Sequence, residues 1–310
     1  MKEFALYSLQ ANILLIVSYL LYSWLLSNES TFKANRFYLL TSAFISLVVP
    51  LINIPGFFKS LLVQVNMGQV IVYKVGSYIT SSQFSYSSLL AVFYIAGVCI
   101  AAIIFIKNIL QISFLIFKSP AHKEKGYTRV YSKKAEGVFS FLKFMVIPSG
   151  KPCEDSEVIE HELTHIRQMH SLDVLFFELL SVLFWYNPVC YLYKSAAKEN
   201  HEFLADDAVV QGKENRSEYA KRIMAYALNI TPYSLPGNFI YHSFLRRRII
   251  MLAKQPSDAR RFASRYAASG MLLLVMITLT SFLKDRNIVL YSNVSACKSN
   301  LILQGQVNAA

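Results

Sequence analysis

A short segment near the middle of the chain combines two imidazoles with a carboxylate, in the order His161-Glu162-Leu163-Thr164-His165. On a helix, side chains four residues apart share a face, so both imidazoles can bind one metal ion while Glu162 reaches the water beside it. This spacing is typical of a zinc site that hydrolyses peptide bonds. The local sequence favours a helix, because Ser156 precedes an acidic first turn and apolar residues follow at helical spacing.

The residues immediately after this motif exclude one class of zinc peptidase. Metzincins continue with Gly and His at the third and sixth positions beyond the second His, where this chain has Gln168 and Ser171. His170 lies further along on another face of the same predicted helix, so we expect it to be a surface or capping residue. A third ligand must therefore come from a different segment.

Acidic residues around Glu202-Phe203-Leu204-Ala205-Asp206 can supply that ligand. A carboxylate completes a zinc site of two His and one Glu and leaves a fourth position for water. We expect Glu202 to bind the metal, and Asp206, one turn further on, to orient a ligand imidazole. Glu199 and His201 are the alternative ligands, and a solvated acidic helix face is the interpretation without a metal.

The composition places this site in a membrane protein. The 310 residues are 54% hydrophobic and only 16% charged, which is too apolar for an ordinary soluble enzyme. Four apolar runs are near membrane-spanning length, at residues 6–26, 37–57, 89–117 and 267–283. We therefore expect a mainly α integral membrane protein, with an α+β protease domain between the third and fourth spans.

Basic residues predict on which side of the membrane this domain lies. They gather after the third span and before the fourth, at Lys118, Lys123, Lys125, Arg129, Arg260, Arg261 and Arg265. The positive-inside rule places the segment between them in the cytoplasm, and Lys33 and Arg36 place the first loop on the same side. The net charge of +12 then indicates contact with anionic lipid and no direct nucleic-acid binding, since no aromatic-basic motif accompanies it.

The expected divisions follow from this topology. They are a three-span membrane domain (1–117), a cytoplasmic zinc metalloprotease domain (118–266), a fourth span (267–283) and a short extracytoplasmic tail (284–310). The cysteines are scattered through these divisions, which indicates neither a disulfide framework nor a Cys-type zinc site.

A further apolar run, from Val174 to Leu192, is not expected to cross the membrane. A crossing there would put the histidine pair and Glu202 on opposite sides of the bilayer. Asn187-Pro188 breaks the run, because Pro lacks a backbone donor and disfavours helix at the residue before it. We expect two helices joined at this break, buried in the protease domain and resting on the spans.

Three other segments have interpretations of their own. The β-prone run Gly137–Pro148 predicts a pair of core strands, or alternatively an edge strand that pairs with an extended substrate. Gly126–Lys134 is polar, and we expect a mobile loop there that is a candidate for self-cleavage. The basic run Arg246–Arg248 lies on a helix predicted to start near Asn238, and its expected partners are lipid phosphates.

Together these motifs make the chain resemble the BlaR/MecR-type membrane zinc metallopeptidases, a family within the gluzincins. The resemblance covers residues 1–283 and includes the four-span layout. It rests on His161–His165, Phe184-Trp185-Tyr186-Asn187-Pro188, Glu202–Asp206 and Arg247-Arg248-Ile249. It implies a multi-pass protein of the bacterial cytoplasmic membrane whose protease domain faces the cytoplasm. The chain departs from the beta-lactam receptors of this family, because no S-x-x-K motif of a penicillin-binding sensor domain follows the last span, so we do not expect beta-lactam sensing.

The function that the resemblance implies is signal transduction by proteolysis. The enzyme would cleave itself or a cytoplasmic regulator protein in response to an envelope signal. Its expected partners are the lipid bilayer and that protein substrate, and a homodimer is left open. The expected cofactor is one Zn²⁺ ion, which would activate water so that Glu162 takes a proton and returns it to the leaving amine. His201, Tyr226 and His242 are the candidates for stabilising the oxyanion.

Two other classes of function remain as alternatives. The protein could be a non-proteolytic membrane sensor or scaffold with a structural or vestigial metal site, which a fourth protein ligand such as His201 would favour. A transporter is the weaker alternative, because the intramembrane charge Lys107 lies late in its span, where it can reach the interface.

Overall fold

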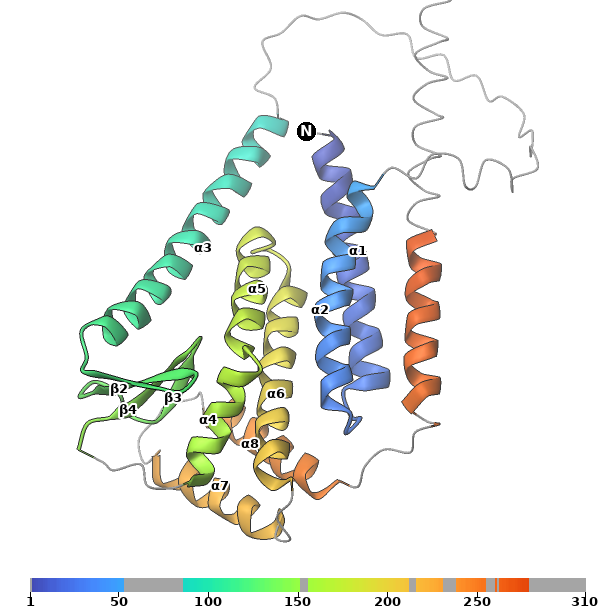
Figure 1. Ribbon diagram of the computed structural model, residues 1–310. Coiled ribbons are helices and arrows are strands. Elements are labelled where there is room, and N and C mark those ends of the chain that lie inside the picture. Colours follow the sequence, from blue (N-terminus) through green and yellow to red (C-terminus); the bar gives the residue numbers. More distant parts are fainter. Residues whose placement is uncertain are drawn as a thin grey trace, which may run out of the picture.

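The computed structural model describes residues 2–52, 86–150, 156–211, 216–230, 238–254, 260 and 262–278. These residues form a largely helical protein with one small sheet (Figure 1). The elements are α1 (Lys2–Leu21), the π-helical turn η1 (Tyr22–Leu26), α2 (Phe32–Val48), the 3₁₀ turn η2 (Val49–Leu51), α3 (Tyr86–Phe117), β1 (Ala121–Glu124), β2 (Tyr127–Ser132), β3 (Phe139–Phe141), β4 (Phe144–Pro148), α4 (Ser156–Arg167), α5 (His170–Leu183), α6 (Pro188–Val210), α7 (Arg216–Ile230) and α8 (Asn238–Ala253). A further helix, Phe262–Thr278, follows α8.

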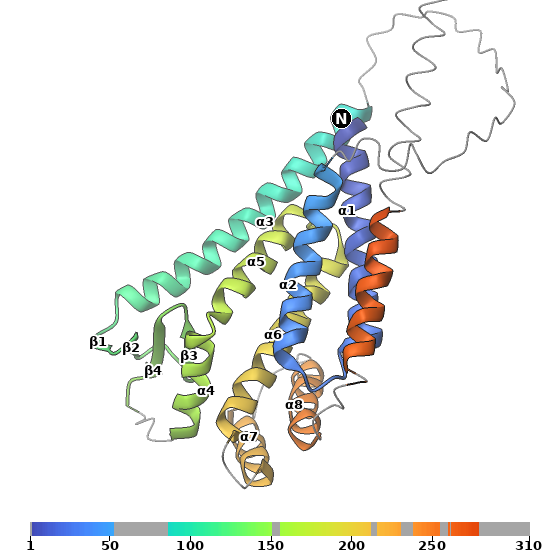
Figure 2. The same ribbon diagram turned by 45° about the vertical axis from the view of Figure 1, so that its right-hand side comes forward.

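Three helical segments are long and apolar enough to cross a membrane: Phe4–Leu26, Phe32–Leu51 and Leu89–Phe117. The second begins at Phe32 and not, as expected from the sequence, at residue 37. The helix can include Lys33 and Arg36 because neither charge has to enter lipid. Lys33 is exposed, and Arg36 forms an ion pair with Asp173 of α5. The expected fourth span is described only as far as Thr278, in an apolar helix that lies beside α1 and α2 in both views (Figures 1 and 2).

Helix α3 diverges from α1 and α2 toward its C-terminal end (Figures 1 and 2). Its apolar side chains are therefore largely uncovered; Ile100 is 61% exposed and Ile103 is 66% exposed. A continuous apolar surface of this size on a long helix is stable when lipid covers it.

The sheet has the strand order β1-β2-β4-β3, with β2 and β4 parallel and the two outer pairs antiparallel. The strand pair predicted within Gly137–Pro148 is confirmed, with a tight turn at Leu142 (φ 52°) that leaves β3 at the edge. The mobile loop expected at Gly126–Lys134 is wrong. Strand β2 lies there instead, inside the sheet. The residues next to Val130 are polar, but the Val130 side chain points inward and is fully buried.

The junction between α4 and α5 also differs from expectation. The metal-motif helix ends at Arg167, and Met169 adopts a left-handed conformation (φ 55°) that lets a new helix start at His170. His170 therefore does not continue the first helix, and its ring folds back toward α4. It is 2% exposed, so the expectation of a surface or capping residue is wrong.

The apolar run between the two halves of the site forms a hairpin of α5 and α6, which confirms the predicted break at Asn187-Pro188. Asn187 caps α6 by accepting a hydrogen bond from the Val189 amide at 2.9 Å. The hairpin packs against α1 and α2, and Phe177 and Tyr193 are fully buried in the core that these four helices share. Helices α7 and α8 close the opposite end of the molecule (Figure 1).

Polar contacts hold the turn of this hairpin against α1. The Asn187 amide donates to Asn12 Oδ1 at 2.6 Å, and the Tyr186 hydroxyl lies 2.6 Å from the Ser8 hydroxyl. Ser8 and Asn12 lie near the N-terminal end of the first candidate span, Phe4–Leu26. The hairpin therefore extends along most of the length of this span. The turn is thus fixed to a membrane helix far from the metal motif.

The other side of the turn contacts α3. Tyr94 donates to the Leu183 carbonyl at 2.9 Å, and the Trp185 indole packs so closely on Gly97 that an added Cβ would overlap it. Only glycine leaves room for the indole at this position of α3.

We expect Gly97→Val to displace Trp185 and to destabilise the protein by about 1–3 kcal/mol, the usual cost of overpacking. Thermal unfolding of the full chain in detergent measures this loss. Gly270→Val is the matched control in another apolar helix, since an added Cβ there meets nothing within 4 Å. Equal unfolding temperatures for the two variants would contradict the close contact, and Trp185→Ala should relieve the effect of Gly97→Val.

Candidate metal centre

Helix α4 is amphipathic, and its two faces have different tasks. Ile166 is buried with Met145 and Ile147 of β4, so one face is fixed on the sheet. The other face presents His161 and His165 toward α6. Packing on the sheet therefore fixes the position of the histidine pair beside α6.

Helix α6 brings Glu202 to the histidine pair, as the sequence predicts. Its two carboxylate oxygens lie 3.4 Å from His161 Nε2 and 3.5 Å from His165 Nε2, and the two Nε2 atoms are 3.3 Å apart. Within the part of the chain that the structure describes, this is the one group of three side chains able to hold a metal ion.

The spacing of these atoms fits a tetrahedral metal ion. Ligand atoms at about 2.0–2.2 Å from a tetrahedral zinc ion lie about 3.3–3.6 Å from one another. The separations given above fall in this interval, with each Nε2 atom measured to a different oxygen of Glu202. Two imidazole nitrogens and one carboxylate also match the donor set of catalytic zinc sites, which keep the fourth position for water or substrate.

Asp206 lies behind the histidine pair, one turn after Glu202, as predicted. Its Oδ1 atom is 3.2 Å from His161 Nδ1 and accepts a hydrogen bond from the Tyr219 hydroxyl at 3.0 Å. A hydrogen bond at Nδ1 fixes the tautomer that leaves Nε2 free for a metal. Asp206 is 1% exposed, so this orientation is held inside the protein.

Arg248 of α8 also belongs to the site, and the expectation that it contacts lipid phosphates is wrong. Its guanidinium donates to both carboxylate oxygens of Asp206, at 2.8 and 2.6 Å, and lies 3.0 Å from Glu202 Oε2. Its neighbour Arg247 pairs with Glu199 at 2.9 Å, which directs this alternative ligand away from the histidines. Arg246 is exposed.

These charges strongly affect one another. Burial opposes ionisation of Glu202, but the His161 hydrogen bond and the Arg248 charge outweigh it and lower the pKa of Glu202 to about 2. Burial also opposes the His161 cation, but hydrogen bonds to Asp206 and Glu202 raise the pKa of His161 to about 9. Burial lowers the pKa of His165 to about 4. A metal ion at His161 Nε2 would therefore compete with a proton.

The structure describes only one of the three side chains expected to stabilise the oxyanion. The His201 ring borders a hollow beside His165, but it is 3% exposed and its Nε2 is already engaged, 2.8 Å from Asp173 Oδ2. The side chains of Tyr226 and His242 lie outside the described residues. Tyr219 also belongs to the site, with its hydroxyl 3.3 Å from His161 Nδ1. Its place is not predictable from the sequence, because no spacing rule connects it to the motif.

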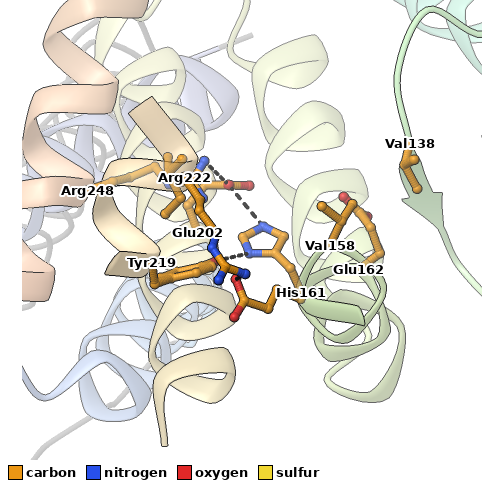
Figure 3. A pocket seen from close by; sticks show the side chains of 10 residues that line it. Val138, Val158, His161, Glu162, Glu202, Tyr219, Arg222 and Arg248 are labelled. Carbon is orange, nitrogen blue, oxygen red and sulfur yellow. Dashed lines mark hydrogen bonds and ion pairs between the residues drawn. The ribbon is translucent and has the colours of Figure 1, made fainter. Parts of the chain in front are cut away.

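Glu162 lies between two hollows. One, of about 200 Å³, is lined by Val138, Glu162, Glu202 and Tyr219 among others, and Figure 3 shows His161 at its centre with Glu162 on the side toward Val138. The other, of about 390 Å³, is lined by Glu162, Glu202, His165 and strand β3. Both carboxylates line both hollows, so within the described part of the chain the site is open on two sides.

Comparison with known proteins gives this site a family. Residues 145–252 match the family model described as BlaR1 peptidase M56. This region is similar to the BlaR1-type M56 peptidases. The chain is also 25% identical over 231 residues to the regulatory protein BlaR1 of Staphylococcus aureus, a match that covers 64% of this chain and 38% of that relative. The resemblance to the BlaR/MecR-type family is thereby confirmed, and the chain spans well under two thirds of the relative's length.

The matched M56 region contains every residue of the candidate centre described above. A metallopeptidase family implies a metal, and the three converging side chains are the described residues able to bind one. The apolar helices and the relationship to BlaR1 together identify a membrane protein.

The Arg248 ion pairs yield a prediction for the metal-free M56 domain. Arg248→Gln leaves Asp206 and Glu202 buried without their cation, so we expect the free energy of unfolding to fall by about 3–5 kcal/mol. Denaturant unfolding of chelator-treated protein in detergent measures it. Arg247→Gln, on the same helix with a side chain that is 41% exposed, is the control and should cost about 1 kcal/mol or less. Similar losses for both variants would contradict the buried network.

Proposed function

We propose that the protein is a membrane-embedded zinc endopeptidase that transduces an envelope signal by cleaving itself or a cytoplasmic regulator protein. One observation supports this above all. His161, His165 and Glu202 converge at zinc-ligand spacing, and Glu162 lies beside them in a cleft that is open on two sides.

Zinc is the proposed metal because the donor set is two imidazole nitrogens and one carboxylate oxygen. When bound, the ion would supply Lewis-acid polarisation of the scissile carbonyl and acidify a water molecule. His161 and His165 would hold it through Nε2, and Asp206 would keep His161 in the required tautomer. Glu202 would complete the set of protein ligands.

Glu162 is the proposed general base and acid. Burial raises the pKa of its carboxyl group. The higher proton affinity suits Glu162 to take a proton from water and to return it to the leaving amine. A hydrogen bond from Ser140 of β3 acts in the opposite direction and keeps the carboxylate available, as does the charge of His161 in the metal-free protein. Glu162 would accept a proton from water and deliver it to the leaving amine.

Tyr219 and Arg248 replace His201 as our candidates for stabilising the oxyanion. Both line the hollow beside His161 (Figure 3). Burial and the neighbouring Asp206 raise the pKa of Tyr219, so its hydroxyl stays protonated, and turning this hydroxyl away from Asp206 would direct the proton to an oxyanion. Arg248 carries a permanent positive charge.

The proposal of an endopeptidase rests on the shape of the cleft and on strand β3. A cleft open at both ends admits the middle of a chain, whereas an exopeptidase must close one end around a terminus. Strand β3 is an edge strand that lines the hollow containing Glu162 and His165. An extended peptide could add to this edge and pass its carbonyl over the metal position.

A fourth protein ligand, such as His201, would favour the sensor or scaffold alternative. Within the described residues, the His201 ring is instead bonded to Asp173 through Nε2. The open position therefore supports catalysis over a structural metal. The name of the relative, a regulatory protein, supports a role in signalling. The basic residues at the two ends of the domain support the proposed cytoplasmic orientation, and the homodimer remains a prediction.

We expect Glu162→Gln to reduce peptide-bond cleavage by about 10²- to 10⁴-fold without loss of bound zinc, because it removes the base but none of the ligands. Mass spectrometry of cells, following this protein and its membrane neighbours, detects the cleavage products. Glu160→Gln is the control on the same helix, since the Glu160 side chain is 42% exposed and pairs with Arg167 away from the site.

The metal itself is tested by elemental analysis of the purified full chain. One equivalent of zinc is expected in the wild type and in Glu162→Gln, and none in Glu202→Ala. Zinc without any product that depends on Glu162 would favour the scaffold alternative, and a wild type without zinc would contradict the proposed centre.

A further inference from the structure

A buried chain of polar side chains leads from the candidate ligand His165 to a membrane helix. We propose that His170 is a positioning residue for His165, and that Asp173 and Arg36 tie this pair of histidines to α2. The inference rests on the proposed function, because it takes His165 as a metal ligand. It adds a physical connection between a candidate span and the metal centre.

The first step is a hydrogen bond between two imidazoles. His165 Nδ1 and His170 Nδ1 are 2.8 Å apart. With His165 Nε2 directed toward a metal, its proton resides on Nδ1 and is donated to His170. His170 then carries its own proton on Nε2, where Gln168 Oε1 accepts it at 3.2 Å. Each donor in this chain has an acceptor, so the tautomer of His165 is defined.

The second step fixes the His170 ring. It stacks on His201 with the ring centroids 4.1 Å apart and the planes 8° from parallel. His201 in turn lies 2.8 Å from Asp173 through Nε2. Since His170 and His201 are 2% and 3% exposed, neither ring can turn without disturbing the packing around the other.

The third step joins Asp173 to the membrane part of the protein. Arg36 of α2 donates to both oxygens of Asp173, at 2.6 and 3.1 Å, and to the Gln168 carbonyl at 2.7 Å. A two-bond pair of this kind has a defined geometry as well as a favourable energy. Arg36 therefore contacts α5 and the junction between α4 and α5, on both sides of His170.

The polar side chains from Arg36 to His170 connect the candidate span α2 to the metal position through few contacts. A displacement of α2 that breaks the Arg36 pair frees Asp173, then His201, and then the ring on which His165 depends. His161 has a separate support in Asp206, so such a displacement acts on one ligand and spares the other. A membrane signal could in this way weaken the metal site without unfolding it.

The test measures Zn²⁺ affinity of the full chain in detergent by competition with a chelator, together with the absorption spectrum of the Co²⁺-loaded protein. His170→Phe keeps an aromatic ring beside His201 but removes the acceptor for His165. We expect its zinc dissociation constant to rise about 10- to 100-fold, with a changed Co²⁺ spectrum. His170→Gln offers an amide acceptor and should restore much of the affinity.

The membrane end of the chain is tested in the same assay. Arg36→Met should weaken zinc binding by about 10-fold, whereas Lys33→Met, which removes an exposed charge from the same helix, should leave it unchanged. Thermal unfolding of each variant separates loss of affinity from loss of fold. Unchanged affinity and Co²⁺ spectrum in folded His170→Phe and Arg36→Met would overturn the inference while leaving the metal centre standing. No zinc binding by the wild type would instead overturn the proposed function.

Discussion

The structure depends on one constraint: the candidate metal-binding atoms come from α4 and α6, and these two helices are separated by an apolar stretch of nearly membrane-spanning length. His161 and Glu202 must lie within 3.4 Å of each other, which requires that the stretch begin and end on the same side of the membrane. The chain meets this requirement by folding back at Asn187-Pro188. The sheet under α4 and the spans beside α6 then fix the two halves of the site in register.

A fold-back among membrane helices leaves backbone groups in need of partners, because lipid offers none. The turn between α5 and α6 supplies them from within the protein. The Asn187 amide nitrogen of the backbone donates to the Phe184 carbonyl, and the Leu183 and Trp185 carbonyls accept hydrogen bonds from Tyr94 and Tyr191. Aromatic residues with a hydroxyl suit this position, since they pair the turn and remain compatible with an apolar surrounding.

Much of the fold and the candidate site is predictable because its signals are local. The His161–His165 motif, the break before Pro188 and the acidic pair ending at Asp206 each lie within a few residues, and the structure brings them together as expected. Arg248 and His170 could not be placed in this way. A basic run and a lone histidine have several ordinary interpretations, and only tertiary packing aligns Arg248 with Asp206 or folds His170 back at Met169. Strand β2 could not be predicted for the same reason, since most of its residues are polar and only one of its faces is buried.

Arg36 shows how a topological signal and a site contact can be the same residue. As a basic residue at the end of a span it helps to set which side of the membrane α2 begins on. Its guanidinium also forms paired hydrogen bonds with Asp173, a residue that is 7% exposed. A charge buried with its partner tolerates little displacement, because separating the two leaves both poorly solvated. Movement of α2 along its axis by one helical turn, about 5.4 Å, would break this pair, whereas a small tilt would preserve it. Contacts of this kind favour two discrete arrangements over a continuous range, which is what a signal that switches a peptidase on or off requires.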